Sequence, residues 1–328
     1  IRGILIRSAS YVVTRGCRLH RNSSTALDYY TVVNGVVQDC QVTENTGMHA
    51  NGLTFYVGCK NILIERNIVR DGNAGITLHT GENMIIRNNI IEGGRGGAPA
   101  VGLWAGQPFN QIVMTNNVFR YHGQGGSDPT MGIYGGNQGA KGYAIVNNII
   151  DGISGNVLLK ADLHHNLFTR LGPGMTLAQL GDNRLVQNLD EIFIDAPGHD
   201  YRPATDSPAI DAGADIAKLN AYDIEGVPRP QGKALDIGPY EVIPSGTDLK
   251  SKRRLIDPHD FKFTFAGYEI APPPEFKVTY QLRFKRREGA KTIVKKGIDL
   301  TGEGGGQVKH RPTRGGYVAH WYNPGHWL

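Results

Sequence analysis

The residues best suited to chemistry in this sequence end a set of short, similar runs. The runs GLTFY, GITLH and NVLLK finish on Tyr56, His79 and Lys160. An imidazole or a phenolate can abstract a proton from carbon, and an ammonium can neutralise a neighbouring carboxylate. A β-elimination that breaks a chain of uronic acid sugars needs both tasks. His79, Lys160 and Tyr56 are therefore the candidate catalytic residues, and the alternative is that they are ordinary surface side chains.

Aromatic residues lie in runs of the same kind. If Leu53, Ile76, Leu103 and Ile133 face inward, the following residues form an outward row on neighbouring repeats: Thr54, Thr77, Trp104 and Tyr134. Aromatic faces bind the apolar faces of sugar rings, so Trp104, Tyr134 and Thr77 are candidate substrate-binding residues. The alternative is that a long loop covers the two aromatic rings as a small core. Gly106 and Gly136 would leave a shallow trough between His79 and Lys160.

Two glycine-rich loops add secondary candidates. They follow Glu92 and Arg120 and carry Arg95 and His122, which we add to the substrate-binding set because loops on a rigid scaffold often bind ligands. Hydrolysis of a glycan would need two carboxyl groups about 5–10 Å apart. The nearby acidic residues do not form a pair on adjacent repeats: Asp71, Glu82 and Asp128.

A repeated phrase indicates the elements that position these residues. The phrases TRGCRL, VQDCQV, IERNIV, IRNNII, MTNNVF, IVNNII and LHHNLF share one polar or cysteine position: Cys17, Cys40, Asn67, Asn89, Asn117, Asn148 and Asn166. Apolar residues stand three positions before and two positions after each of these, which indicates strands with one buried face. Repeats of this length indicate a solenoid. We predict at least two strands in each coil of a parallel β-helix, with the asparagines stacked at a buried turn.

The chain also resembles two known families. The NNII, NNVF and GI phrases over residues 1–195 resemble the pectin-lyase-like right-handed parallel β-helix proteins, which implies an all-β, single-stranded right-handed solenoid. The phrases SPAIDAG, DIEGVPRP and ALDIGPYE, within 207–241, resemble the choice-of-anchor Q region of bacterial β-helix proteins. This second resemblance implies an exported bacterial protein, secreted or on the cell surface, with a terminal region at 196–245.

Composition agrees with a turn-rich chain of 328 residues with 44 glycines and a net charge of +5. No run approaches the ~18 apolar residues of a transmembrane segment. Ile1 begins inside strand-like sequence, so we expect N-terminal coils to precede it. A Cys17–Cys40 bridge is geometrically open, but free thiols are the default expectation.

The basic character lies in residues 246–328, which carry 16 Lys and Arg against 8 Asp and Glu. Alternating apolar and polar residues from Phe276 to Lys285 predict a strand in a small β appendage. Its positive charge could bind an acidic polysaccharide or a membrane surface, and nucleic acid is not expected. The alternative is that the charges only keep an exposed strand edge solvated.

Two parts of the sequence carry groups of potential metal ligands. His164 and His165 point to opposite faces of a strand, so no structural metal site is predicted there. Ca²⁺ is the candidate cofactor because acidic sugars often bind through it and several aspartates cluster near the anchor-like region: Asp206, Asp211, Asp215, Asp223 and Asp236. The alternative is that these carboxylates accept backbone N–H groups in turns.

The function predicted from the sequence is binding, and cleavage by a lyase reaction, of an acidic polysaccharide. Whether the protein is an enzyme is left open. The alternatives are a non-enzymatic adhesin or structural filament subunit, and a glycoside hydrolase. Homo-oligomers or end-to-end assemblies are compatible with the solenoid.

Overall fold

The computed structural model describes residues 3–47, 49–79, 81–94, 97–104, 109–122, 132–135, 141–154, 161–172, 175–176, 180–216, 218–244, 279–284 and 293–299. Contacts divide the chain into two units, Ile1–Glu269 and Ile270–Leu328. The predicted domain boundaries after residues 195 and 245 remain predictions. Several residues singled out above lie outside the described ranges: Arg95, Gly106, Asp128, Gly136 and Lys160.

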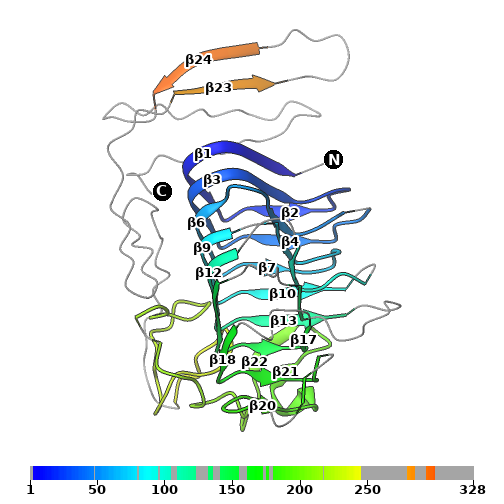
Figure 1. Cartoon of the computed structure of the whole chain (residues 1–328), viewed down its shortest axis with the longest axis vertical. Coiled ribbons are helices and arrows are strands. Elements are labelled where there is room, and N and C mark those ends of the chain that lie inside the picture. The colour runs from blue at the N-terminus through cyan, green and yellow to red at the C-terminus, as the bar shows by residue number, and fades with distance from the viewer. Residues whose placement is uncertain are drawn as a thin grey trace. The chain divides into compact units, whose positions relative to one another are not determined.

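The first unit is built from parallel strands stacked in three columns (Figure 1). The first column contains β5 (Leu53–Phe55), β8 (Ile76–Leu78), β11 (Val101–Leu103), β14 (Ile133–Gly135) and β17 (Ile153–Ser154). The second column contains β6 (Lys60–Glu65), β9 (Gly81–Arg87), β12 (Phe109–Thr115), β15 (Lys141–Val146) and β18 (Ala161–His164). The long strands β1 (Ile4–Arg15) and β3 (Leu27–Gln38) pair with each other, and β3 continues into both columns.

The third column forms a separate 8-stranded sheet. Its members are β2 (Arg18–His20), β4 (Gln41–Thr43), β7 (Ile68–Val69), β10 (Ile90–Gly93), β13 (Val118–Tyr121), β16 (Ile149–Ile150), β19 (Leu167–Phe168) and β20 (Arg184–Leu185). A full coil therefore contributes three strands. The expected parallel β-helix is confirmed.

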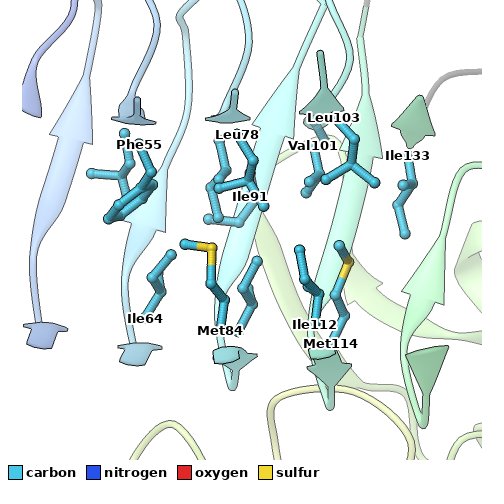
Figure 2. Close-up of a cluster of buried hydrophobic side chains, with 14 of the residues drawn as sticks. Phe55, Ile64, Leu78, Met84, Ile91, Val101, Leu103, Ile112, Met114 and Ile133 are labelled. Carbon is cyan, nitrogen blue, oxygen red and sulfur yellow. The ribbon is translucent and has the colours of Figure 1, made fainter. Parts of the chain in front are cut away.

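Alternation along each strand places apolar side chains in one continuous interior. Figure 2 shows Phe55 and Leu78 of the first column extending toward Ile64 and Met84 of the second column. These residues are fully buried. Burying one such side chain stabilises the fold by about 1.5–3 kcal/mol, so the inward positions have little freedom to do chemistry.

The turn between the second and third columns is made in the same way on seven coils. We call the stacked residues from Cys17 to Asn166 the ladder, and the residue before each of them has a positive φ: Gly16, Asp39, Arg66, Asn88, Asn116, Asn147 and His165. From Cys40 onward, each ladder residue forms a hydrogen bond with its equivalent on the following coil. Asn89 Nδ2, for example, donates to Asn117 Oδ1 at 2.9 Å. Asn183 extends the predicted ladder by one more coil, because its Oδ1 accepts from Asn166 Nδ2 at 2.8 Å.

The described residues between 186 and 241 cover the outer face of the third column. The short 3₁₀ helix η4 (Leu189–Glu191) begins at Asn188, whose side chain accepts from the Asp190 N–H, and precedes the antiparallel pair β21 (Phe193–Asp195) and β22 (Asp200–Pro203). Apolar residues from this region pack on outward residues of the third column in a second core: Ile90, Val118, Ile149 and Leu167 against Ile192, Phe193, Tyr201, Ala209, Ile224 and Ile237.

The same region also contacts the turns of three coils. Asn220 exchanges hydrogen bonds with Asn88 at 2.7 and 2.9 Å, and its Nδ2 also donates to Asn116 Oδ1 at 3.0 Å. Asn147 Nδ2 donates to Ala214 O, and Asn147 Oδ1 accepts from the Ala214 N–H. The chain beyond the last coil is therefore packed along the side of the stack.

The described part of the second unit is one antiparallel pair, β23 (Thr279–Phe284) with β24 (Ile293–Asp299). This confirms a strand within the predicted 276–285 segment. Across the described ranges, no helix has the length and hydropathy needed to span a membrane.

Candidate functional site

The outward residues of the first column form two neighbouring rows. The first row, read along the strand register, contains Asp28, Thr54, Thr77, Gly102, Tyr134 and Ser154. The second row lies two residues further along each strand and contains Arg7, Tyr30, Tyr56, His79 and Trp104, as the register and backbone hydrogen bonds establish. All the sequence-predicted residues of this face that the structure describes lie in these two rows.

The predicted place of Trp104 was wrong. Gly102, and not Trp104, is paired with Thr77, and the Trp104 N–H donates to Leu78 O at 2.8 Å, which puts Trp104 beside His79. The reason is that Ala100 takes the place that Gly75 holds in the preceding coil, so Val101 is the inward residue that follows it. Trp104 therefore stands where the predicted trough required a glycine.

The prediction that Thr77 lines an open surface was also wrong. Thr77 faces away from the main core, yet it is buried, as are Asp28, Thr54 and Ser154 in the same row. The hydroxyl groups of Thr54 and Thr77 have no hydrogen-bond partner among the described residues. The polar members of this row are buried, so Thr77 is not open to a large ligand.

The second row is a stack of rings. Tyr30 and Tyr56 lie parallel with centroids 3.9 Å apart, and Tyr56 and His79 lie parallel at 4.5 Å. The guanidinium of Arg7 lies 4.6 Å from the Tyr30 ring centre, at the other end. Stacking across neighbouring strands and a cation at one face stabilise such a row. The faces of Tyr30 and Tyr56 are used within the stack, so these two rings present their edges.

Trp104 differs from the rings before it. Its indole lies over Gly102, because a Cβ on that glycine would stand 2.8 Å from Trp104 Nε1. The Tyr134 ring is 5.5 Å away and tilted by 54°. Trp104 is 37% exposed, one of the few large apolar side chains among the described residues with that much open surface. The two rings are therefore in contact, as predicted, although Trp104 and Tyr134 belong to different rows.

His79 joins the ring stack to this aromatic pair. Partial burial lowers the pKa of His79 below its ordinary value of 6.5, so its imidazole is neutral at pH 7. A neutral imidazole can accept a proton. Tyr56 lies against its face, so Tyr56 is positioned to hold the His79 ring.

A second group of polar residues lies on the outer face of the third column. Three positions after each ladder residue, an outward row runs through His20, Thr43, Arg70, Glu92, Arg120, Asp151 and Thr169. Opposite charges meet within it: Arg120 Nε donates to Asp151 Oδ2 at 2.8 Å. Asp151 also accepts from Thr169 and Arg170, which satisfies its buried carboxylate.

Glu92 brings His122 into contact with residues from the terminal region. Its carboxylate lies 2.8 Å from His199 Nδ1, accepts from the Tyr201 hydroxyl at 2.8 Å and is 3.3 Å from His122 Nε2. Burial would raise the pKa of Glu92, but hydrogen bonds from the two histidines and Tyr201 outweigh it and hold the pKa below its ordinary value. The sequence indicated His122 as a candidate binding residue, but it did not indicate its neighbours Glu92, His199 and Tyr201. The recurring offset from the ladder could have indicated Glu92, whereas only the docked hairpin reveals His199 and Tyr201.

Three of the five aspartates considered for Ca²⁺ accept backbone N–H groups: Asp211, Asp223 and Asp236. Asp223 Oδ1 accepts from Glu225 and Val227, and Asp236 Oδ1 accepts from Asp211. Within the described ranges, no group of three or more His, Cys, Asp or Glu side chains could hold a metal ion. The alternative of turn aspartates is confirmed for Asp223 and Asp236.

Comparison with known proteins agrees with this architecture. Residues 2–119 match the family described as "Right handed beta helix region". No curated protein and no solved structure matches the chain. The fold is a right-handed parallel β-helix with a small antiparallel pair near the C-terminus.

Proposed function

Starting from this right-handed parallel β-helix, we propose that the protein is exported by a bacterium and binds an acidic polysaccharide beside Trp104 and Tyr134. The reaction that we assign to it is β-elimination, with His79 as the base. A rigid stack of coils offers an elongated outer surface, which suits a polymer better than a small molecule.

The observation that carries the proposal is the exposed Trp104 ring next to Tyr134. Trp104 is 37% exposed and is fixed by contact with Tyr134 at 5.5 Å and by its place over Gly102. An indole held in this way needs little ordering when a sugar ring packs on it. The apolar C–H face of the sugar would contact the ring while its hydroxyl groups stay in water.

In the proposed reaction, His79 removes the C5 proton of a uronic acid unit. The electrons of that C–H bond form the C4–C5 double bond, the C4–O bond breaks, and the oxygen that leaves with the preceding sugar takes up a proton from water. A cation must neutralise the carboxylate as charge develops on it. Lys160 and Arg95 are the candidates for that role, and both lie outside the described residues.

The second candidate function is a non-enzymatic adhesin or filament subunit. It is favoured by the ring stack itself, because Tyr30, Tyr56 and His79 satisfy one another at 3.9 and 4.5 Å. In that case the row strengthens the solenoid and its histidine has no reaction to perform. Hydrolysis gains no support: Glu82 is 2.7 Å from Lys60, and Asp71 is 3.8 Å from Arg70.

Binding is tested with the purified full chain and a panel of acidic and neutral polysaccharides, by retention on immobilised polymer. Trp104→Ala should weaken retention at least about tenfold, as expected when one aromatic anchor of a site is lost. Ile243→Ala is the matched control, because Ile243 is 39% exposed. Equal retention by Trp104→Ala and Ile243→Ala would refute the site.

The reaction is tested by following the ultraviolet absorbance of unsaturated products together with reducing ends. His79→Phe keeps a flat ring on Tyr56 and removes the base, whereas His79→Ala removes both. If His79 is the base, both variants lose turnover and His79→Phe keeps the thermal midpoint. Unsaturated product made at the normal rate by His79→Phe would exclude this role, and no product from the unaltered protein would favour the adhesin.

A further inference from the structure

Cysteines replace asparagine at two consecutive positions of the ladder. Cys17 and Cys40 precede β2 and β4, and the ladder continues with Asn67. Asn67 Nδ2 donates across the coils to Val37 O at 3.0 Å, and the Cys40 thiol occupies the equivalent place, with Sγ 3.6 Å from Thr14 O. The Cys40 side chain therefore reaches toward the coil that carries Cys17.

Backbone pairing holds the two cysteines side by side. The Gln41 N–H donates to Cys17 O at 2.8 Å, and the Gly16 N–H donates to Gln38 O at 3.0 Å, on either side of the pair. Neighbouring strands place equivalent Cα atoms about 4.8 Å apart. Disulfides form over Cα separations of roughly 4.4–6.8 Å.

A small approach of the two side chains is still required, because bonded cysteines have Cβ atoms about 3.8 Å apart. The register of β2 on β4 favours this approach, because Arg18 pairs with Gln41 directly after the two cysteines.

The two thiols also differ in reactivity. Cys17 is half-buried and Cys40 is buried. A hydrogen bond from the Cys40 thiol lowers the pKa of Cys17 to about 7, while the same bond and burial raise the pKa of Cys40. Cys17 is therefore the accessible thiolate at neutral pH, and thiolates are the species that react with disulfides.

We propose that Cys17 and Cys40 form a reversible disulfide that joins the first two described coils, with Cys17 as the attacking thiol and Cys40 as the resolving thiol. The oxidant is a small-molecule disulfide such as oxidised glutathione. The structure holds the reduced form, in which both cysteines are free.

The chemistry balances in two exchanges. The Cys17 thiolate attacks one sulfur of oxidised glutathione, forms a mixed disulfide and releases one glutathione thiolate. Capping removes the negative charge of Cys17 that opposes ionisation of Cys40. Cys40 then loses its proton, attacks the Cys17 sulfur and releases the second glutathione, so two protein thiols are oxidised and one glutathione disulfide is reduced.

Cys59 provides a built-in control. It is buried, its thiol donates to Tyr29 O, and it lies in a different turn from the ladder. Burial raises the pKa of the Cys59 thiol. It should react with neither glutathione nor an alkylating reagent while the protein is folded.

The test is to incubate the folded full chain with oxidised glutathione and measure its intact mass. The unaltered protein and Cys59→Ser should each lose two hydrogen atoms, and digestion should yield one linked peptide pair containing Cys17 and Cys40. Cys17→Ser and Cys40→Ser should not lose them, and Cys40→Ser should accumulate a glutathione adduct on Cys17.

A second measurement uses one protein in two states and so does not depend on a variant folding. The closed loop spans residues 17–40, and constraint of the unfolded chain should raise the thermal midpoint of the oxidised form by roughly 5 °C relative to the reduced form. The proposal is overturned if Cys59→Ser keeps both thiols, if a stable glutathione adduct persists on Cys17 in the unaltered protein, or if oxidation lowers the midpoint.

Discussion

Asn117 offers the sharpest test of how the solenoid is stabilised. Its side chain is fully buried and makes five hydrogen bonds. Oδ1 accepts from the backbone N–H and the side-chain amide of Asn89, both at 2.9 Å. Nδ2 donates to Ile86 O, Thr115 O and Asn148 Oδ1 at 2.8, 3.0 and 2.9 Å. Asn117→Ala removes all five at once.

The size of the effect follows from which groups lose their partner. The Asn89 backbone N–H is left buried without an acceptor, which costs about 1–3 kcal/mol, and each of the other lost bonds adds about 0.5–1 kcal/mol. Asn89 Nδ2 is spared because it still donates to Ile64 O and Arg87 O. With three other bonds lost, Asn117→Ala should therefore lower the free energy of unfolding by about 2.5–6 kcal/mol.

The assay is urea unfolding followed by circular dichroism, with the slope of the transition compared between variants. Asn73→Ala is the matched control, since Asn73 Nδ2 makes one exposed hydrogen bond to Gly47 O at 3.2 Å. That control should lose less than about 1 kcal/mol. Equal losses from Asn73→Ala and Asn117→Ala would refute the claim that the buried ladder, and not the turn sequence, stabilises the stack.

Three further predictions concern ionisation and packing. Hydrogen bonds depress the pKa of Glu92 in the folded protein, so its stabilising effect is present above the ordinary value of 4.5 and is lost as pH falls through the folded pKa. In Glu92→Gln, the urea midpoint should therefore fall less steeply as the pH is lowered below 4.5. Burial raises the pKa of Glu241 to about 6 despite Arg229 nearby, so the stabilisation present below pH 4.5 is lost as the pH rises through 6. The thermal midpoint should fall over that range, and Glu241→Gln should abolish the fall. Gly102→Ala would place a Cβ 2.8 Å from Trp104 Nε1, so the indole must move; its fluorescence should change and polysaccharide retention should weaken, and an unaltered spectrum would contradict the described ring position.

The repeating parts of the fold could be predicted because one side-chain rule operates at each turn. The ladder position was visible in the sequence from Cys17 to Asn166, and the strand that follows Asn67 or Asn89 begins where the apolar pattern placed it. The sequence analysis missed Asn183, although the phrase LGDNRL fits the pattern: Leu180 stands three positions before the asparagine and Leu185 two positions after it. The hydrogen bonds of Asn183 match those of Asn166.

The candidate site was less predictable because a local motif does not determine register. Gly102 resembles Gly75 in sequence, but the strand register assigns that structural place to Ala100. A shift of two residues keeps the inward and outward faces and changes which side chains become neighbours. Trp104 is therefore the neighbour of His79, and not of Thr77 as the sequence predicted. The contacts of Glu92 with His199 and Tyr201 are beyond a motif, since they depend on how a distant hairpin packs.

The hydrogen bonds from the terminal region to Asn88, Asn116 and Asn147 constrain the number of coils in this part of the stack. Asn220 reaches two adjacent coils, and Ala214 meets the third, so the contacts fit only if the three turns follow one another at one-coil spacing. Duplication or deletion of a coil between Asn88 and Asn147 would prevent Asn220 and Ala214 from making these hydrogen bonds together. Coils on the N-terminal side of Asn88 have no such constraint from Asn220 or Ala214. Over evolution, or in engineering, the stack should lengthen and shorten on that side.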